Sequence, residues 1–294
     1  MDIIFDPQLL IARKLRALTQ GPAGADFLMQ RMAEDLGERL STVERRFERA
    51  AAIFSLTPDA ARVVAASGKA ATVLRVEADQ RLLGDDEFEG VLAEPEIVPL
   101  EPESIDLAVS LLTMHEVNDL PGLLVQIRRV LKPDGLFLGA MAGGSTLQEL
   151  RQSLLEAEAE LTGGASPRVY PFADVRDAGG LLQRAGFSLP VTDVETMPVR
   201  YNTMFDLMRD LRAMGATSAL VERSRKPAPR KLFLRAAEIY QDRFSDPDGR
   251  VRATFNIIWM SGWAPHESQQ KPLKPGSAAV SLANVLDELD KQKK

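Results

Sequence analysis

The chain of 294 residues is 45% hydrophobic and 27% charged, so it can bury a sizeable core and is not compositionally disordered. It holds no cysteine and two histidines, which excludes disulfides, thiolate metal sites and cysteine nucleophiles, and we expect no metal site. The formal net charge of −6 argues against nucleic acid as a partner, because phosphate binding requires a basic surface.

Residues 1–50 are predicted to be a helical segment. Residues 7–18 have the pattern of a short amphipathic helix with Arg13, Lys14 and Arg16 on its wet side, which packs onto the body or contacts a membrane peripherally. Residues 25–50 show apolar residues at helical spacing. The start is acidic where a signal peptide is basic, and the chain has no run of about 18 apolar residues, so we expect a cytoplasmic protein.

The chain then alternates between short apolar runs and helical or turn-rich segments. Such runs are typical of strands that are buried on both faces of a parallel sheet. They cover residues 51–56, 71–76, 105–112 and 135–141. A helix with Pro121 in its first turn precedes the last run and ends in a Lys-Pro-Asp-Gly turn. We therefore predict an α/β fold.

The C-terminal half is predicted to contain four helices and two strands. The helices cover residues 146–161, 174–185, 204–214 and 230–244, and the strands cover 189–201 and 253–263. If these two strands are antiparallel neighbours, residues 202–251 form a helical cap inserted between them. The core then comprises residues 51–201 and 252–270, and residues 271–294 form a tail.

Candidate ligand sites lie at the carboxyl ends of the strands, because open α/β sheets bind ligands there. The turn after the first strand lacks the glycines of a nucleotide-binding loop, and the nearest glycine downstream is Gly68. Ser55, Thr57 and Asp59 suit a helix cap instead. Either the capped helix start attracts an anion, or the turn holds no ligand.

Two further strand ends carry polar groups. Glu77 follows the second strand and is placed to accept hydrogen bonds from ribose hydroxyls, and Glu94 either meets an adenine edge or is a plain loop residue. Ser110 and Leu111 end the central strand, and His115 and Glu116 follow it. His115 acts as a general base or positions a substrate, or it is merely hydrogen-bonded at a strand exit.

The C-terminal strand gathers Trp259, Trp263 and His266 within a short stretch. Aromatic rings beside polar groups suit a substrate wall or a partner surface, although Trp259 is better explained by packing of the strand onto the sheet.

The charged residues are unevenly distributed along the chain. Residues 75–106 hold eleven acids and two arginines, whereas residues 223–235 hold six basic residues and no acid. The basic run suits an acidic partner or anionic headgroups.

Several motifs resemble those of one family. They are VNDLP (117–121), LKPDG (131–135), GSTLQELR (144–151), SP (166–167), PF (171–172), LMRDLRAMG (207–215), DG (248–249), GW (262–263), HESQ (266–269) and GSA (276–278). By these the chain resembles the seven-stranded S-adenosylmethionine-dependent methyltransferases, and among them the complex I assembly factor 5 family and its bacterial relatives. BioC-type methyltransferases, which esterify a malonyl group on a carrier protein, are more distantly similar. The chain departs from the family in the missing first glycine motif and in Glu116, where an aromatic residue is common.

The resemblance implies a doubly wound, mostly parallel seven-stranded sheet with a helical insert before the last strand. It implies S-adenosylmethionine as cofactor, held by Phe54, Ser55, Leu56, Glu77, Glu94, Ser110, Leu111 and Met114. It also implies that substrate approaches near Met114, His115 and the cap. We take His115 and His266 as the candidate catalytic residues.

By the same resemblance, the protein modifies or chaperones a protein partner during assembly of the respiratory NADH dehydrogenase. Three alternatives stay open: a non-catalytic assembly factor that has lost the cofactor, a protein arginine hydroxylase, and a BioC-like carboxyl methyltransferase. The partner is expected to be a subunit of the respiratory complex. Peripheral membrane contact is expected at most, through residues 223–231 or the N-terminal helix.

Overall fold

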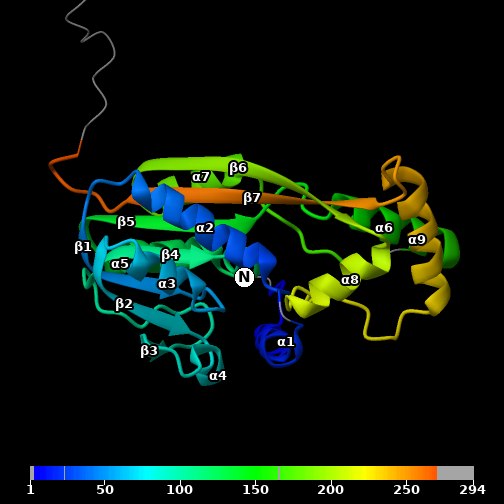
Figure 1. Ribbon diagram of the computed structural model, residues 1–294, viewed down its shortest axis with the longest axis horizontal. Helices are drawn as coiled ribbons and strands as arrows, with labels where there is room; N and C mark the ends of the chain where they lie inside the picture. The colour runs from blue at the N-terminus through cyan, green and yellow to red at the C-terminus, as the bar shows by residue number, and fades with distance from the viewer. Residues whose placement is uncertain (1–2, 23, 165, 270–294) are drawn as a thin grey trace, which may run out of the picture.

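The computed structural model describes residues 3–22, 24–164 and 166–269, so the predicted tail lies outside the described residues. The described residues form one seven-stranded sheet with the order β3-β2-β1-β4-β5-β7-β6. Helices cover both faces of the sheet (Figure 1). The strands are β1 (Phe47–Ile53), β2 (Ala70–Glu77), β3 (Glu89–Leu92), β4 (Ile105–Leu111), β5 (Leu131–Ala142), β6 (Ser188–Tyr201) and β7 (Val251–Trp263).

The first five strands pair in parallel, and β7 pairs antiparallel with both β5 and β6. The predicted fold class is therefore confirmed, including the helical insert between the last two strands. The helices are α1 (Pro7–Gln20), α2 (Phe27–Ser41), α3 (Asp59–Ala66), α4 (Gln80–Leu83), α5 (Leu120–Val130), α6 (Gln148–Thr162), α7 (Val175–Arg184), α8 (Met204–Ala213) and α9 (Arg230–Phe244), with a 3₁₀ turn η1 (Met114–Glu116).

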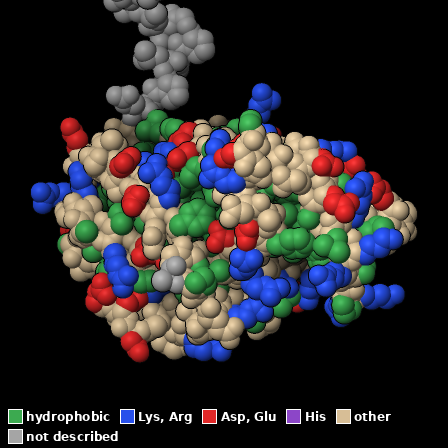
Figure 2. All heavy atoms as spheres, turned by 45° about the vertical axis from the view of Figure 1, so that its right-hand side comes forward, with side chains coloured by type: hydrophobic (Ala, Val, Ile, Leu, Met, Phe, Trp, Pro, Cys, Tyr) green, Lys and Arg blue, Asp and Glu red, His purple; other side chains and the backbone are tan. Residues whose placement is uncertain are grey.

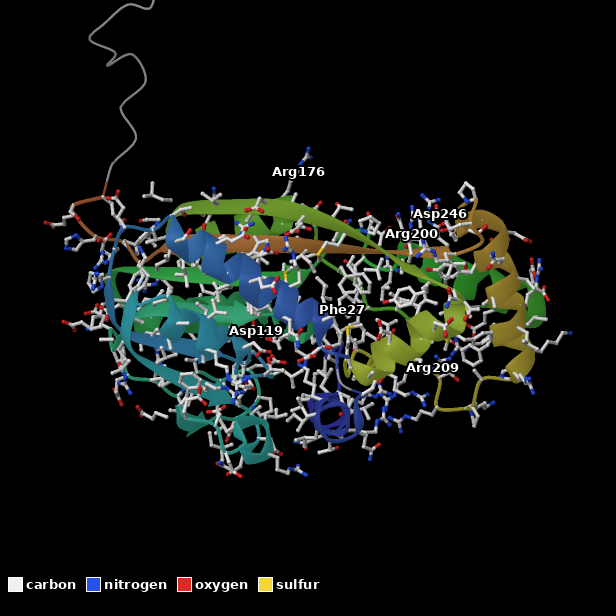
Figure 3. The ribbon with its side chains drawn as sticks, viewed as in Figure 1. Phe27, Asp119, Arg176, Arg200, Arg209 and Asp246 are labelled. Atoms are coloured by element: carbon white, nitrogen blue, oxygen red, sulfur yellow. The ribbon has the colours of Figure 1, made fainter. Side chains whose placement is uncertain are left out.

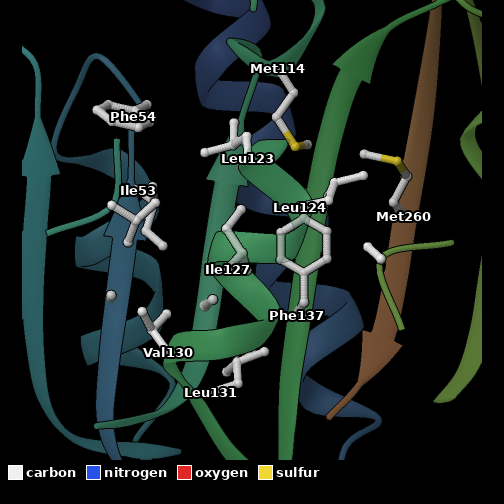
Figure 4. Close-up of a cluster of buried hydrophobic side chains, with 14 of the residues drawn as sticks. Ile53, Phe54, Met114, Leu123, Leu124, Ile127, Val130, Leu131, Phe137 and Met260 are labelled. Atoms are coloured by element: carbon white, nitrogen blue, oxygen red, sulfur yellow. The ribbon is translucent and has the colours of Figure 1, made fainter. Parts of the chain in front are cut away.

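Helix α5 anchors one face of the sheet. Asp119 caps it by accepting a hydrogen bond from the Gly122 N–H at 2.8 Å, and Pro121 lies in its first turn, where no N–H is needed. Its apolar stripe packs against β1, β4, β5 and β7, as Figure 4 shows. The buried residues of this stripe are Leu123, Leu124, Ile127 and Val130. Burial of such side chains contributes roughly 1.5–3 kcal/mol each and fixes the helix on the sheet.

The opposite face is covered by α2 and α3. Met32, Leu36 and Leu40 of α2 are fully buried there, together with Trp259 of β7. The Trp259 ring is thus a core residue, as packing of the last strand onto the sheet requires. The guanidinium of Arg39 lies 4.3 Å from the centre of this ring and covers its outer side.

The second helix is shorter than its sequence pattern predicts. Helix α2 ends at Ser41, and β1 already begins at Phe47, so the expectation of a helix over residues 25–50 was wrong in its last part. Phe47 continues the apolar stripe of the helix in sequence, but its segment pairs with both β2 and β4. Tertiary pairing on both edges of a central strand overrides the local helical spacing.

The predicted Lys-Pro-Asp-Gly turn lies inside strand β5. The strand begins at Leu131, which pairs with Ile105, and the register then shifts before Leu136 pairs with Leu107. Asp134 has a φ of +64° within this irregular stretch. The turn is therefore a bulge at the start of the strand rather than a separate connection.

Strands β6 and β7 extend beyond β5 and carry the inserted helices. Strand β5 pairs with β7 up to Ala142, whereas β6 and β7 continue to pair as far as Tyr201 and Val251. Helices α6, α8 and α9 pack on this extension in a cluster of their own (Figure 1). At its end Arg200 and Asp246 form an ion pair of 2.9 Å, and Figure 3 shows the two side by side.

The Gly-Trp motif at the end of β7 has a packing reason. A Cβ on Gly262 would lie 2.9 Å from the Cβ of Phe187, closer than carbon atoms in contact allow. Phe187 lies just before β6, so glycine lets the two strands approach each other closely.

Among the described residues, every helix is too short or too polar to span a bilayer.

Candidate functional site

A cavity of about 460 Å³ lies at the carboxyl ends of β1, β4 and β5. Leu56 and Leu112 line it from the strand ends, and Tyr170 and Phe172 line it from the segment before α7. Helix α1, the start of α2 and the end of α8 close the other sides. Its volume suits a small ligand or a side chain of a partner protein.

The turn after β1 keeps the backbone of a glycine loop although it has no glycine. Phe54 has a φ of +50° and Leu56 a φ of +59°. This left-handed conformation costs a residue with a Cβ roughly 1–2 kcal/mol, and glycine adopts it freely. The Phe54 side chain packs into the core beside α5 (Figure 4), and Leu56 lines the cavity. At the cavity, the Leu56 side chain therefore takes the place that a glycine would leave open to a ligand.

Hydrogen bonds tie this turn to the end of β4. The Ser55 hydroxyl accepts from the Leu111 N–H at 3.2 Å, and the Thr113 hydroxyl donates to the Phe54 carbonyl. Helix α3 begins at Asp59 without a side-chain cap, because the Thr57 hydroxyl donates to the Asp59 carboxylate at 2.7 Å instead. The capping role expected for Ser55, Thr57 and Asp59 is therefore not present.

The acid at the end of β2 is enclosed. Glu77 is 3% exposed, and the Arg75 guanidinium, 1% exposed, lies 3.4 Å from its carboxylate. Burial raises the pKa of Glu77 to about 7, while the charges of Arg75 and Lys14 and the N–H groups of Leu56 and Ser55 lower it. The Glu77 Oε1 atom that a ribose hydroxyl could contact is thus already paired with Arg75.

Of the residues predicted to hold S-adenosylmethionine, Leu56 lines the cavity. Ser55 lies at the neighbouring strand ends, where its hydroxyl accepts a hydrogen bond from the Leu111 N–H. Leu111 and Met114 are buried in the core, and Glu94 is exposed on a loop. The Ser110 hydroxyl is buried and has no hydrogen-bond partner among the described residues. Together with the Leu56 side chain in the turn and the enclosed Glu77, this arrangement does not fit S-adenosylmethionine.

His115 lies in the cavity wall but is not poised as a base. Its Nδ1 accepts a hydrogen bond from the Ala142 N–H at 3.3 Å, so the proton of the neutral ring is on Nε2. Burial lowers its pKa to about 4, and the charge of Lys14 acts in the same direction. The ring is therefore neutral near pH 7 and offers an N–H donor, which suits positioning of a ligand.

The cavity also contains an ion pair that sequence reasoning missed. The Lys14 Nζ lies 2.6 Å from the Glu116 Oε2, with the two side chains 15% and 5% exposed. Lys14 was expected on the wet side of the first helix, and that expectation was wrong. The sequence signal that could have indicated this ion pair was Glu116, a charged residue at a position where the family commonly has an aromatic one.

His266 is not brought to this site. It follows β7, which runs antiparallel, so the end of β7 at Trp263 lies beside Leu136 near the start of β5. His266 is exposed there and contacts Ser268 at 2.7 Å. The neighbouring Gln269 donates to the Asp134 carboxylate at 3.0 Å, which joins the HESQ segment to the Lys-Pro-Asp-Gly bulge. These two motifs therefore stabilise the strand end opposite the cavity.

The described part of the chain contains no group of three or more His, Asp or Glu side chains that could hold a metal ion. The cavity combines an apolar wall, an imidazole N–H donor and the buried Glu116 carboxylate with Lys14 beside it, and Asp26 and Arg168 also line it. Such a site can bind a cationic side chain through charge-assisted hydrogen bonds.

Comparisons with known proteins place the chain among methyltransferase-like sequences. A family model described as a methyltransferase domain matches residues 50–139. The chain is 38% identical to the human arginine-hydroxylase NDUFAF5, mitochondrial, over 96% of this chain and 83% of that protein. It is 47% identical to the Danio rerio protein of the same name over 66% of this chain, and this match spans 60% of the length of that relative.

A malonyl-[acyl-carrier protein] O-methyltransferase from Methylovorus is 38% identical over 63% of this chain and 60% of that protein. Among solved structures, a candidate methyltransferase from Bacillus halodurans aligns with a TM-score of 0.55 and 15% identity, over 80% of this chain and 99% of that chain. The YcgJ protein from Bacillus subtilis aligns with a TM-score of 0.53 and 15% identity, over 79% and 99%. At this identity the two structures share the fold alone.

Proposed function

This chain belongs to the family of the arginine-hydroxylase NDUFAF5, and we propose that it binds a protein partner during assembly of a respiratory NADH dehydrogenase. The proposal rests on a difference between the two halves of the carboxyl edge of the sheet. The cavity beside β4 and β5 is open, whereas the turn after β1 and Glu77 are filled and enclosed. A protein with this arrangement keeps a place for a partner, and the proposed role does not depend on S-adenosylmethionine.

A basic surface supports the docking of a protein partner. Arg225, Lys226, Arg230 and Lys231 are exposed at the connection between α8 and α9. Figure 2 shows Lys and Arg side chains gathered toward the lower right, on the side that carries these helices. We assign the helical cap of residues 202–251 to partner docking, with an acidic face of the partner as its complement. The proposal includes a cytoplasmic location with at most peripheral membrane contact through residues 223–231.

Hydroxylation of an arginine of the partner is the second candidate; it would insert one atom of O2 into a C–H bond and release the other as water, with two electrons from an external reductant. It is the activity in the names of the relatives that match over most of this chain, and the Glu116 carboxylate offers the bidentate acceptor that a guanidinium prefers. Methylation by S-adenosylmethionine is a weaker candidate, because the residues at the ends of β1 and β2 do not fit that cofactor.

The test uses cells that lack this chain and cells complemented with variants of it. We expect the deletion to lower NADH dehydrogenase activity in membranes, wild type to restore it, and Glu116→Ala to restore little of it. Glu94→Ala is the matched control, because Glu94 is exposed outside the cavity, and it should restore full activity. Soluble expression and an unchanged circular dichroism spectrum establish that each variant is folded.

Full activity in the deleted cells, or full restoration by Glu116→Ala, would contradict the proposal. Mass spectrometry of the NADH dehydrogenase subunits tests for arginine hydroxylation. An arginine that gains one oxygen atom in complemented cells, and not in deleted ones, supports hydroxylation; identical masses in both cells exclude it.

A further inference from the structure

Strand β6 leaves one edge of the sheet open. It is the last strand in the order of the sheet and forms its upper border in Figure 1. On its neighbour β7, the N–H and C=O groups of Thr254 and Asn256 bond to residues 143–149, which follow β5. These two residues lie opposite Pro198 and Thr196 of β6. Directly opposite residues of an antiparallel pair either bond to each other or both face away, so Pro198 and Thr196 face the open edge.

The open stretch of β6 holds three residues with free backbone groups. Directions alternate along a strand, so the N–H and C=O groups of Thr192, Val194 and Thr196 point away from β7. Within the described residues, these groups have no backbone hydrogen-bond partner. Pro190 and Pro198 flank the stretch, and proline is tolerated on the open side of an edge strand because no N–H is needed there. The edge can therefore accept one short additional strand.

One face of this edge carries excess negative charge. Asp193 and Glu195 alternate with the free residues and lie on the side of α2, where two nitrogens of Arg39 bond to the Asp193 carboxylate at 2.7 and 2.8 Å. Glu195 is left with Arg31 at 3.6 Å, and Arg31 lies closer to Asp35, at 2.9 Å. Burial and then the charge of Glu195 raise the pKa of Asp35 to about 6. Glu195 is thus a carboxylate that its own chain neutralises incompletely.

The other face of the edge is β-branched. Thr192, Val194 and Thr196 lie on the side of α7, where the Thr192 hydroxyl donates to the Val175 carbonyl at 3.3 Å. Val194 is 45% exposed. Threonine pairs and pairs of opposite charge both stabilise neighbouring strands, and β-branched residues favour strands. The complementary strand therefore alternates between basic and β-branched residues.

A second copy of this chain fits the edge less well than a basic segment does. In the antiparallel pairing of two copies that uses all three free residues, Val194 lies opposite Val194 of the second copy. Asp193 of each copy then lies opposite Glu195 of the other. Like charges directly opposite each other are destabilising. The charge pattern therefore favours a partner with basic residues.

We propose that this edge of β6 docks an extended segment of a partner protein that carries lysine or arginine at every second position and adds a strand to the sheet. Main-chain hydrogen bonds to the three free residues supply affinity, and Asp193 and Glu195 supply specificity. Of the described residues that line the cavity, none belongs to β6. The surface also lies outside residues 202–251, so the inference goes beyond the proposed function and is tested separately from it.

Amide hydrogen exchange of the full-length protein, followed residue by residue by NMR, tests the added strand. The probe is the acetylated and amidated peptide TKVKTKV at millimolar concentration. We expect exchange at Thr192, Val194 and Thr196 to be fast in the free protein and at least about tenfold slower with the probe. The N–H groups of Asp193 and Glu195, which face β7, should exchange slowly in both states. Slow exchange at the three residues without the probe, or no slowing with it, would overturn the proposal.

Two control peptides separate the alternating pattern from charge alone. The peptide TVKKKTV has the same composition with consecutive lysines, and TEVETEV has the same alternation with acids. Neither should protect the three free residues from exchange. Equal protection by TVKKKTV and TKVKTKV would reduce the effect to net charge and contradict the added strand.

Two variants test the two faces of the proposal. Val194→Pro removes the central free N–H and spares the pairing with β7, so it should abolish protection of Thr192 and Thr196. Glu195→Lys should weaken binding of TKVKTKV at least about fivefold, whereas Glu94→Lys, which changes an exposed acid outside the edge, should bind it as wild type does. Unchanged affinity in Glu195→Lys would refute the proposal whether or not Val194→Pro folds. A dimer in sedimentation that Val194→Pro converts to a monomer would assign the edge to a second copy and overturn it as well.

Discussion

Replacement of Arg75 by methionine is expected to lower the free energy of unfolding by about 3–5 kcal/mol, the cost of breaking a buried ion pair from one side. The Arg75 guanidinium pairs with Asp86 and Glu77 and donates to the Leu83 carbonyl at 2.8 Å and the Leu82 carbonyl at 3.1 Å. Methionine has similar length but no donor, so two carboxylates and two carbonyls lose their partner at once.

Urea denaturation of wild type and Arg75→Met at neutral pH measures this loss. Arg81→Met is the matched control, because Arg81 also pairs with an aspartate, Asp79, but is exposed, and we expect no measurable change there. Combining Arg75→Met with Glu77→Gln should recover part of the loss, since one of the stranded carboxylates is then neutral. Equal stability of Arg75→Met and wild type would show that the arginine does not hold this end of the sheet together.

The second large effect is a pH dependence that Glu77 creates. Burial raises the pKa of this carboxyl from 4.5 to about 7 in the folded protein. The folded state therefore holds the proton more tightly than the unfolded chain does. The stability from this group is fully present below pH 4.5 and is lost as the pH rises through 7, which amounts to about 3 kcal/mol at 1.4 kcal/mol per pH unit.

Glutamine stays neutral at every pH, so Glu77→Gln removes this dependence. We expect the unfolding free energy of Glu77→Gln, relative to wild type, to increase by about 2–3 kcal/mol between about pH 5 and about pH 8. Denaturation curves at several pH values give this difference directly. A difference for Glu77→Gln that does not vary with pH would mean that the Glu77 carboxyl is not enclosed.

Much of the fold could be predicted from local pattern. Strand β4 reads as a mainly apolar run, and α5 carries Pro121 in its first turn, so sequence alone gives their type and nearly their bounds. Strand β5 was predicted as a strand, but it begins four residues earlier than its apolar run. Strand β1 was the exception, because Phe47 extends the periodicity of α2 and its pairing with β2 and β4 is a long-range fact. The local spacing of apolar residues cannot predict that pairing with distant strands overrides helix formation here.

The site was less predictable because its members come from distant segments. Leu56 and His115 were expected near a ligand and do line the cavity. The closing wall from α1 and Tyr170 depends on how the N-terminal helix docks, which no local signal encodes. His266 was misplaced in the expected site because the antiparallel direction of β7 carries its end away from the carboxyl edge.

The missing glycines were the most useful sequence signal. The turn after β1 retains left-handed φ values at Phe54 and Leu56, as a glycine loop would, but with side chains that fill the space. The enclosed Glu77 and its buried partner Arg75 complete this closure. The family fold is thus kept, while the half of the ligand edge that would hold a nucleoside is occupied by the protein itself.

Calorimetric titration of the full-length protein with S-adenosylmethionine tests this account most directly. The filled turn and the enclosed Glu77 predict no saturable heat up to millimolar ligand. Saturable binding in the micromolar range that Glu77→Gln abolishes would contradict the account, because it would show that this end of the sheet opens to admit the cofactor.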